Sequence, residues 1–86
     1  MTRRTLTFKL DSGLHMRPAG RFAEVAMDYV SQVYINCGDK HINGKSLLGI
    51  LSLGIRKDDK YTIVCEGEDE KEAMAALVTL IKNGFE

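Results

Sequence analysis

A histidine followed closely by an arginine and a proline is the group of residues in this 86-residue chain best suited to chemistry. Proline is tolerated in a helix only in the first turn, where its missing N–H has no intrahelical partner to lose. Pro18 therefore places the start of a helix at about residue 15 or 16, with His15 at or beside the N-cap. Unpaired N–H groups and about half a positive charge gather at a helix N-terminus, and both favour an anion such as phosphate.

Arg17 adds a permanent positive charge two residues from His15. Its planar guanidinium matches the geometry of phosphate oxygens. The segment thus combines a nucleophilic side chain, an anion-binding backbone and a cation, which together predict phosphoryl transfer. The pattern alone leaves a second interpretation open, because a histidine before a helix is often only a capping or surface residue.

Ser46 is the second residue of interest, because it stands directly before an apolar run in which it would act as the N-cap of a short helix. Gly54 takes the C-cap position after this run. A helix this short cannot bury residues on all of its sides, so part of its apolar surface is left for a partner. The apolar residues of the run are Leu47, Leu48, Ile50, Leu51 and Leu53.

Alternation of apolar and polar residues predicts four strands. They cover Thr5–Leu10, Val33–Cys37, Lys40–Asn43 and Tyr61–Cys65. Two longer helices are predicted from apolar residues at three- and four-residue spacing. The first contains Phe22, Val25, Ala26, Tyr29 and Val30. The second has the acidic residues Glu68, Asp69, Glu70 and Glu72 in its first turn, where the helix dipole favours them, and is closed by Gly84.

The resulting order, βαββαβα, predicts an α+β fold in a single domain over residues 1–86. One-sided strands and amphipathic helices indicate an open-faced two-layer sandwich: a four-stranded antiparallel sheet with three helices on one face.

Charge and composition exclude several classes of function. The formal net charge is zero, which argues against a general nucleic-acid binder. Residues 1–60 nevertheless carry ten Lys or Arg against six Asp or Glu, and residues 61–86 carry two against six, so a locally basic face is expected. No apolar run approaches the ~20 residues needed to cross a bilayer, and the first residues lack a signal-type stretch, which predicts a cytoplasmic protein without membrane insertion.

Neither a disulfide nor a metal site is expected. Cys37 and Cys65 each lie in a strand-like segment and are interpreted as reduced and partly buried. Cys37 and His41 are four residues apart, but they flank a Gly-Asp turn and no second ligand pair exists.

Three segments resemble the HPr family, the histidine-containing phosphocarriers of the bacterial phosphoenolpyruvate-dependent sugar phosphotransferase system. The first is similar to the active-centre signature of that family, the second to its regulatory-serine segment, and the third to its entry into the last helix. The segments are Gly13–Ala19 (GLHMRPA), Gly44–Gly54 (GKSLLGILSLG) and Glu66–Ala73 (EGEDEKEA).

The resemblance implies that His15 takes a phosphoryl group from a phosphohistidine of Enzyme I and donates it to acceptor proteins, with Arg17 steadying the phosphate. No second catalytic group or cosubstrate site is visible in the sequence, so we expect a carrier and not a turnover enzyme, with no cofactor, and we expect it to act as a monomer. Ser46 would be the target of an HPr kinase/phosphorylase. The partner-docking surface implied by the family comprises Met16, Gly20, Arg21, Leu47, Leu48 and Leu51.

A second function stays open, in which the same surface serves a regulatory interaction module controlled by Ser46, with little sugar-transport flux. Three residues depart from the family pattern: Met16 replaces a smaller residue, and Glu24 and Met27 stand where many relatives carry lysine. These departures bear on the choice of partner.

Overall fold

The computed structural model describes all of residues 1–86. Its four strands form one antiparallel sheet in the order β1-β4-β2-β3. The strands are β1 (Thr2–Thr7), β2 (Gln32–Cys37), β3 (Lys40–Asn43) and β4 (Lys60–Glu66), and the helices are α1 (Met16–Ala26), α2 (Leu47–Ser52) and α3 (Glu70–Lys82). β1 and β3 are the edge strands.

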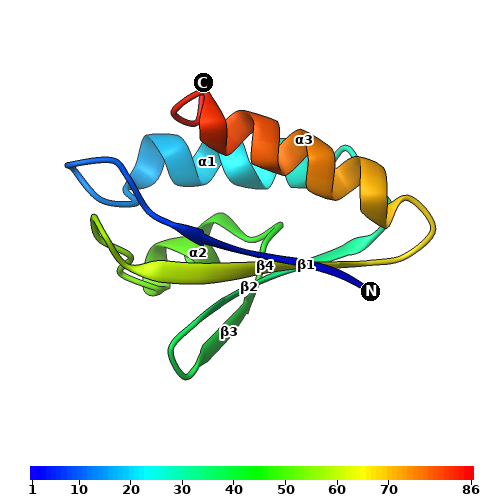
Figure 1. The fold of residues 1–86 in the computed structure, drawn as a ribbon, viewed down its shortest axis with the longest axis horizontal. Coiled ribbons are helices and arrows are strands. Elements are labelled where there is room, and N and C mark those ends of the chain that lie inside the picture. The colour runs from blue at the N-terminus through cyan, green and yellow to red at the C-terminus, as the bar shows by residue number, and fades with distance from the viewer.

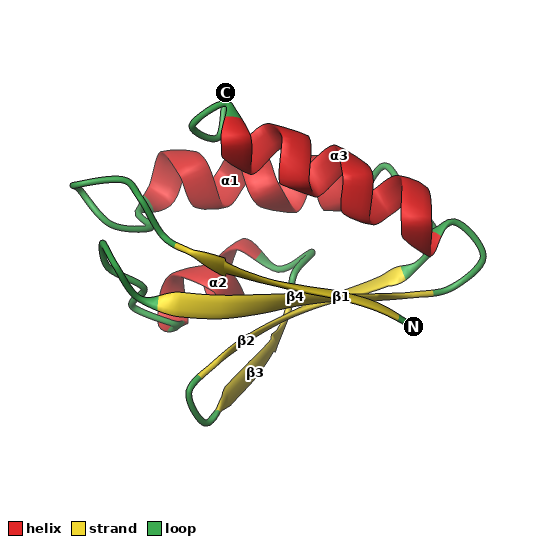
Figure 2. Ribbon diagram, in the orientation of Figure 1, coloured by secondary structure: helices red, strands yellow, loops and turns green.

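The helices cover one face of the sheet and leave the other open. In Figures 1 and 2, α1 and α3 lie over this face, and α2 lies lower, near the level of the sheet. α2 contacts both α1 and β3. The predicted fold class, an open-faced βαββαβα sandwich, is confirmed.

The core lies between the sheet and the helices, where alternation along the strands places it. Val33 pairs with Cys65, and Ile35 pairs with Ile63; all four side chains are buried. The helices contribute the fully buried side chains Phe22, Ile50 and Leu77.

The first strand differs from the prediction of Thr5–Leu10: β1 begins at Thr2 and ends at Thr7. Thr7 pairs with Lys60, the first residue of β4, so the ladder has no partner beyond it. Phe8 instead exchanges hydrogen bonds with the loop before β4, donating to Asp59 O and accepting from Asp58 N, both at 2.8 Å. Phe8 is nevertheless buried, as its place in the alternating pattern indicates, because alternation reports burial without reporting backbone pairing.

The start of α3 also differs in detail from the expected acidic first turn. Asp69 is the N-cap residue, but its carboxylate points to the segment after α1, where it accepts hydrogen bonds from Val30 N, Ser31 N and the Ser31 hydroxyl. These hydrogen bonds lower the pKa of Asp69 below its usual value. The bond from the Ser31 hydroxyl has the largest effect, and the two backbone N–H groups add to it. These bonds tie the exit of α1 to the entry of α3.

Candidate functional site

His15 is the N-cap residue of α1, as Pro18 predicts. Its backbone is extended (φ −99°, ψ −169°), and its carbonyl accepts the first helical hydrogen bond from Ala19 N at 3.0 Å. Its imidazole makes no capping hydrogen bond and is exposed, which removes the interpretation of His15 as a side-chain cap. The ring is therefore free to react.

The loop before His15 is held in place by its backbone. Leu14 N donates to Ile55 O at 2.9 Å, which joins this loop to the segment after α2. Gly13 adopts φ +76°, and a Cβ there would lie 3.1 Å from Ile55 O. Glycine is favoured at this position because the positive φ and the close approach both make a side chain unfavourable.

The first turn of α1 offers an anion two backbone donors. The N–H groups of Met16 and Arg17 have no acceptor within the chain, as expected at a helix N-terminus. Pro18 is buried and supplies no donor, and the backbone donors beside His15 are therefore these two. Together with the helix dipole, they provide the kind of site that binds phosphate oxygens.

His15 and Arg17 line one hollow of about 210 Å³ with Pro18. The guanidinium of Arg17 is exposed and pairs with no carboxylate. Two other segments complete the lining of this hollow. The segment after β1 contributes Leu10, and the segment after α3 contributes Gly84, Phe85 and Glu86.

This contribution from the C-terminal segment was not predicted from the sequence. Phe85 is buried, and its ring centroid lies 5.7 Å from that of Phe8. This aromatic contact holds the segment after α3 beside His15, although about 70 positions separate the two in the chain. No local pattern could have indicated the contact.

Ser46 caps α2 as predicted: its Oγ accepts a hydrogen bond from Gly49 N at 3.1 Å. Gly54 is one position beyond the C-cap, Leu53, and adopts φ +62°. Within α2 only Ile50 is buried; Leu47 and Leu51 are half-buried, and Leu48 is 78% exposed. The expected unburied apolar surface is therefore present on this helix.

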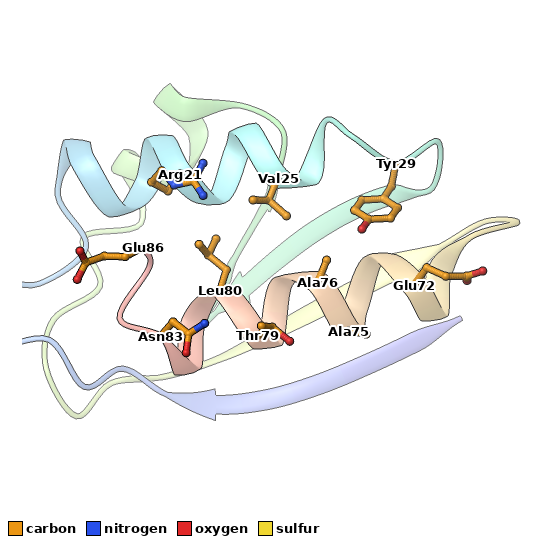
Figure 3. Close-up of a pocket in the computed structure, with 10 residues that line it drawn as sticks. All are labelled: Arg21, Val25, Tyr29, Glu72, Ala75, Ala76, Thr79, Leu80, Asn83 and Glu86. Carbon is orange, nitrogen blue, oxygen red and sulfur yellow. The ribbon is translucent and has the colours of Figure 1, made fainter.

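The residues of α1 expected to dock a partner do not share one environment. Met16 is 62% exposed, and Gly20 faces open space, because no atom lies within 4 Å of where its Cβ would be. Arg21 instead forms an ion pair with Glu24 and lines a second hollow, between α1 and α3 (Figure 3). Glu24, one of the departures from the family pattern, thus compensates the charge of Arg21.

Cys37 and His41 have partners other than a metal. Cys37 Sγ lies 3.5 Å from Lys60 O, in hydrogen-bonding range. The His41 ring stacks on Tyr34, with centroids 4.7 Å apart, and its Nδ1 is hydrogen-bonded to Asn36 Oδ1.

The match to known proteins extends over nearly the whole chain. A family model described as "PTS HPr component phosphorylation site" matches residues 2–83. The chain belongs to the HPr family. HPr-like protein Crh from Halalkalibacterium halodurans is 38% identical over 82 residues, covering 95% of this chain and 98% of that protein. Phosphocarrier protein HPr from Neisseria meningitidis is also 38% identical, over 73 residues that cover 85% of this chain and 81% of that protein.

Solved HPr-family structures share the fold. The structure of HPr from Thermoanaerobacter tengcongensis is similar with a TM-score of 0.94 and 40% identity, covering 99% of this chain and 96% of that chain. A structure of Crh from Bacillus subtilis, described as a dimer with a swapped domain, has a TM-score of 0.77 and 31% identity, covering 96% of this chain and 95% of that chain. HPr-family phosphocarriers carry a phosphoryl group and are not self-contained enzymes. No helix of this chain has the length and apolar character to cross a membrane.

Proposed function

We propose that this HPr-family protein accepts a phosphoryl group on His15 from phosphorylated Enzyme I and passes it to acceptor proteins of the phosphotransferase system. The observation that carries the proposal is the exposed imidazole of His15, free of any hydrogen bond, in one hollow with the unpaired guanidinium of Arg17.

The residues around His15 fit each part of the transfer. A ring nitrogen of His15 attacks phosphorus, and the bond from phosphorus to the donor histidine nitrogen breaks. The N–H groups of Met16 and Arg17 and the Arg17 guanidinium hold the phosphoryl oxygens, whose charge they offset during transfer and afterwards. The reverse set of steps delivers the group to an acceptor.

The test is incubation with Enzyme I and phosphoenolpyruvate, with mass spectrometry before and after acid treatment. One acid-labile phosphoryl group is expected on the wild-type chain and on His41→Ala, and none on His15→Ala. His41 is the matched control because it is the other histidine and lies on the open face of the sheet. Acid-labile phosphate on His15→Ala would contradict the site assignment, provided that the variant retains the wild-type circular dichroism spectrum.

The alternative function is a regulatory interaction module controlled by phosphorylation of Ser46. It is favoured by the similarity to HPr-like protein Crh and by the place of Ser46 at the head of the helix that carries exposed Leu48. The presence of His15 beside Arg17 favours the carrier function instead. Measured rates of transfer from Enzyme I and onward to an acceptor distinguish the two, because a regulatory module would sustain little flux through His15.

The proposed partners are Enzyme I, phosphoryl acceptors and, for Ser46, an HPr kinase/phosphorylase. The proposed docking surface for them comprises Met16, Gly20, Leu47, Leu48 and Leu51, with Arg21 at its margin. A cytoplasmic monomer is part of the proposal; the unpaired thiols of Cys37 and Cys65 suit a reducing compartment. Sedimentation equilibrium tests the monomer against the dimer described for Bacillus subtilis Crh.

A further inference from the structure

A groove between α1 and α3 lies apart from the hollow that contains His15. It has a volume of about 590 Å³, and Val25 of α1 and Tyr29 of the turn after α1 face Ala76 and Leu80 of α3 across it (Figure 3). Only Glu86 lines both hollows. The groove exists because α3 presents small side chains here, where larger ones would fill the space between the helices.

The charges along this groove are mainly negative. Glu72 lies at one end and Glu86 near the other, and neither carboxylate has an ion-pair partner. Arg21 is the one cation that lines the groove, and its charge is compensated by Glu24. The apolar floor therefore lies between two uncompensated carboxylates.

We propose that this groove binds a short amphipathic helix of a partner protein, with an apolar stripe and a basic residue near each end. The distance along α3 from Glu72 to Asn83 is about 17 Å at 1.5 Å per residue, which accommodates about three turns of a bound helix. A helix satisfies its own backbone hydrogen bonds, whereas an extended peptide would find no free strand edge here.

Other occupants fit less well. A small ligand would lack the enclosing walls and converging polar groups of a small-molecule site, since the groove is open and its centre is lined by apolar and small side chains. If two copies of the chain met through this groove, Glu72 and Glu86 of one copy would lie against those of the other, and the like charges would repel.

The test uses a synthetic, fluorescein-labelled helical peptide of about 14 residues, with a leucine stripe and a lysine near each end. Binding is measured by fluorescence anisotropy at low salt. We expect saturable binding, loss of binding when glutamate replaces both lysines of the peptide, and weakening at 1 M salt. In two-dimensional NMR spectra, the signals of Val25, Ala76 and Leu80 should shift, and those of Leu48 should not.

Two variants and a control locate the binding on the groove. Glu72→Lys should raise the dissociation constant about tenfold, because reversing one charge turns an attraction into a repulsion. Ala75→Gln should also weaken binding, since it places a larger side chain at the groove without a strong helix breaker. Glu66→Lys makes the same charge change on the exposed end of β4 and should leave binding unchanged.

Four outcomes would overturn the proposal: no saturable binding, equal binding of the acidic peptide, shifts confined to Met16 and Leu48, or equal effects of Glu66→Lys and Glu72→Lys. Glu72 does not line the hollow of His15, so Glu72→Lys is expected to accept a phosphoryl group at the wild-type rate, and failure of the groove proposal is distinct from failure of the carrier function.

Discussion

Ser46 contributes to stability through one hydrogen bond, which Gly49 N donates to Ser46 Oγ at 3.1 Å. Ser46→Ala removes this cap at a cost of about 1 kcal/mol. For a domain of this size, that loss lowers the thermal midpoint by about 4 to 8 °C. Loss of the cap should lower the stability of the whole domain, because Ile50 of α2 is part of the core.

Ser46→Asp should behave differently, because its carboxylate can still accept from Gly49 N and carries a negative charge at a helix N-terminus, worth about 0.3 to 1 kcal/mol. Its midpoint should equal or slightly exceed that of the wild type. Ser52→Ala is the control in the same helix: the exposed Ser52 hydroxyl donates to Gly49 O at 2.6 Å, and its loss should change stability by less than about 0.5 kcal/mol. Thermal unfolding followed by circular dichroism at pH 7 checks all three, and a Ser46→Ala midpoint equal to that of the wild type would refute the cap.

The same Ser46→Asp variant tests docking. A partner that receives or donates phosphate at His15 and Arg17 should present an acidic surface, and like charges across an interface cost several kcal/mol. Phosphorylation of Ser46→Asp by Enzyme I should therefore be slower than that of the wild type at low salt, and added salt should partly restore the rate. If Ser46→Asp accepts phosphate as fast as the wild type at low and at physiological salt, Ser46 is a helix cap alone.

Three further predictions follow from single contacts. Arg17→Lys should slow phosphorylation of His15 by about 10- to 100-fold at an unchanged thermal midpoint, because a charge-assisted hydrogen bond to phosphate is lost; equal rates would exclude Arg17 from the mechanism. Tyr61→Phe should raise the unfolding free energy by about 1 kcal/mol, because the buried Tyr61 hydroxyl has no hydrogen-bond partner. Burial raises the pKa of Tyr61 to about 12, whereas the Tyr61 hydroxyl of the unfolded chain ionises near pH 10. As the pH rises from 10 to 12, ionisation therefore stabilises the unfolded chain relative to the folded one. Denaturant titrations from pH 9 to 12 should show the stability of the wild type falling more steeply than that of Tyr61→Phe. Gly44→Ala should destabilise the fold by about 1 to 3 kcal/mol, since the new Cβ would lie 2.7 Å from Val33 Cγ1. Gly20→Ala is the control: its Cβ meets open space, and it should stabilise the fold by about 0.4 to 1 kcal/mol in the same denaturant assay.

The elements that local chemistry determines were predictable from the sequence. Pro18 located the start of α1, and Ser46 located the start of α2. Alternation identified the buried residues of β2 and three of the four in β4; it missed Val64, which is buried on the other face of the sheet. The end of β1 was not predictable in the same way. Leu6 and Phe8 continue one alternating pattern, but pairing stops at Thr7 because β4 begins at Lys60.

The His15 site shows the same division between local and distant causes. His15 and Arg17 share a helix terminus, so their proximity follows from their spacing alone. Residues 84–86 line the same hollow, where Phe85 packs against Phe8, and that contact forms only when the sheet and the helix layer are both in place. Arg21 differs from the expected docking residues for a related reason: it lies one position beyond Gly20, which turns it about 100° around the helix toward α3 and its groove. A motif therefore identifies which residues can react, whereas the tertiary packing decides which surface each of them serves.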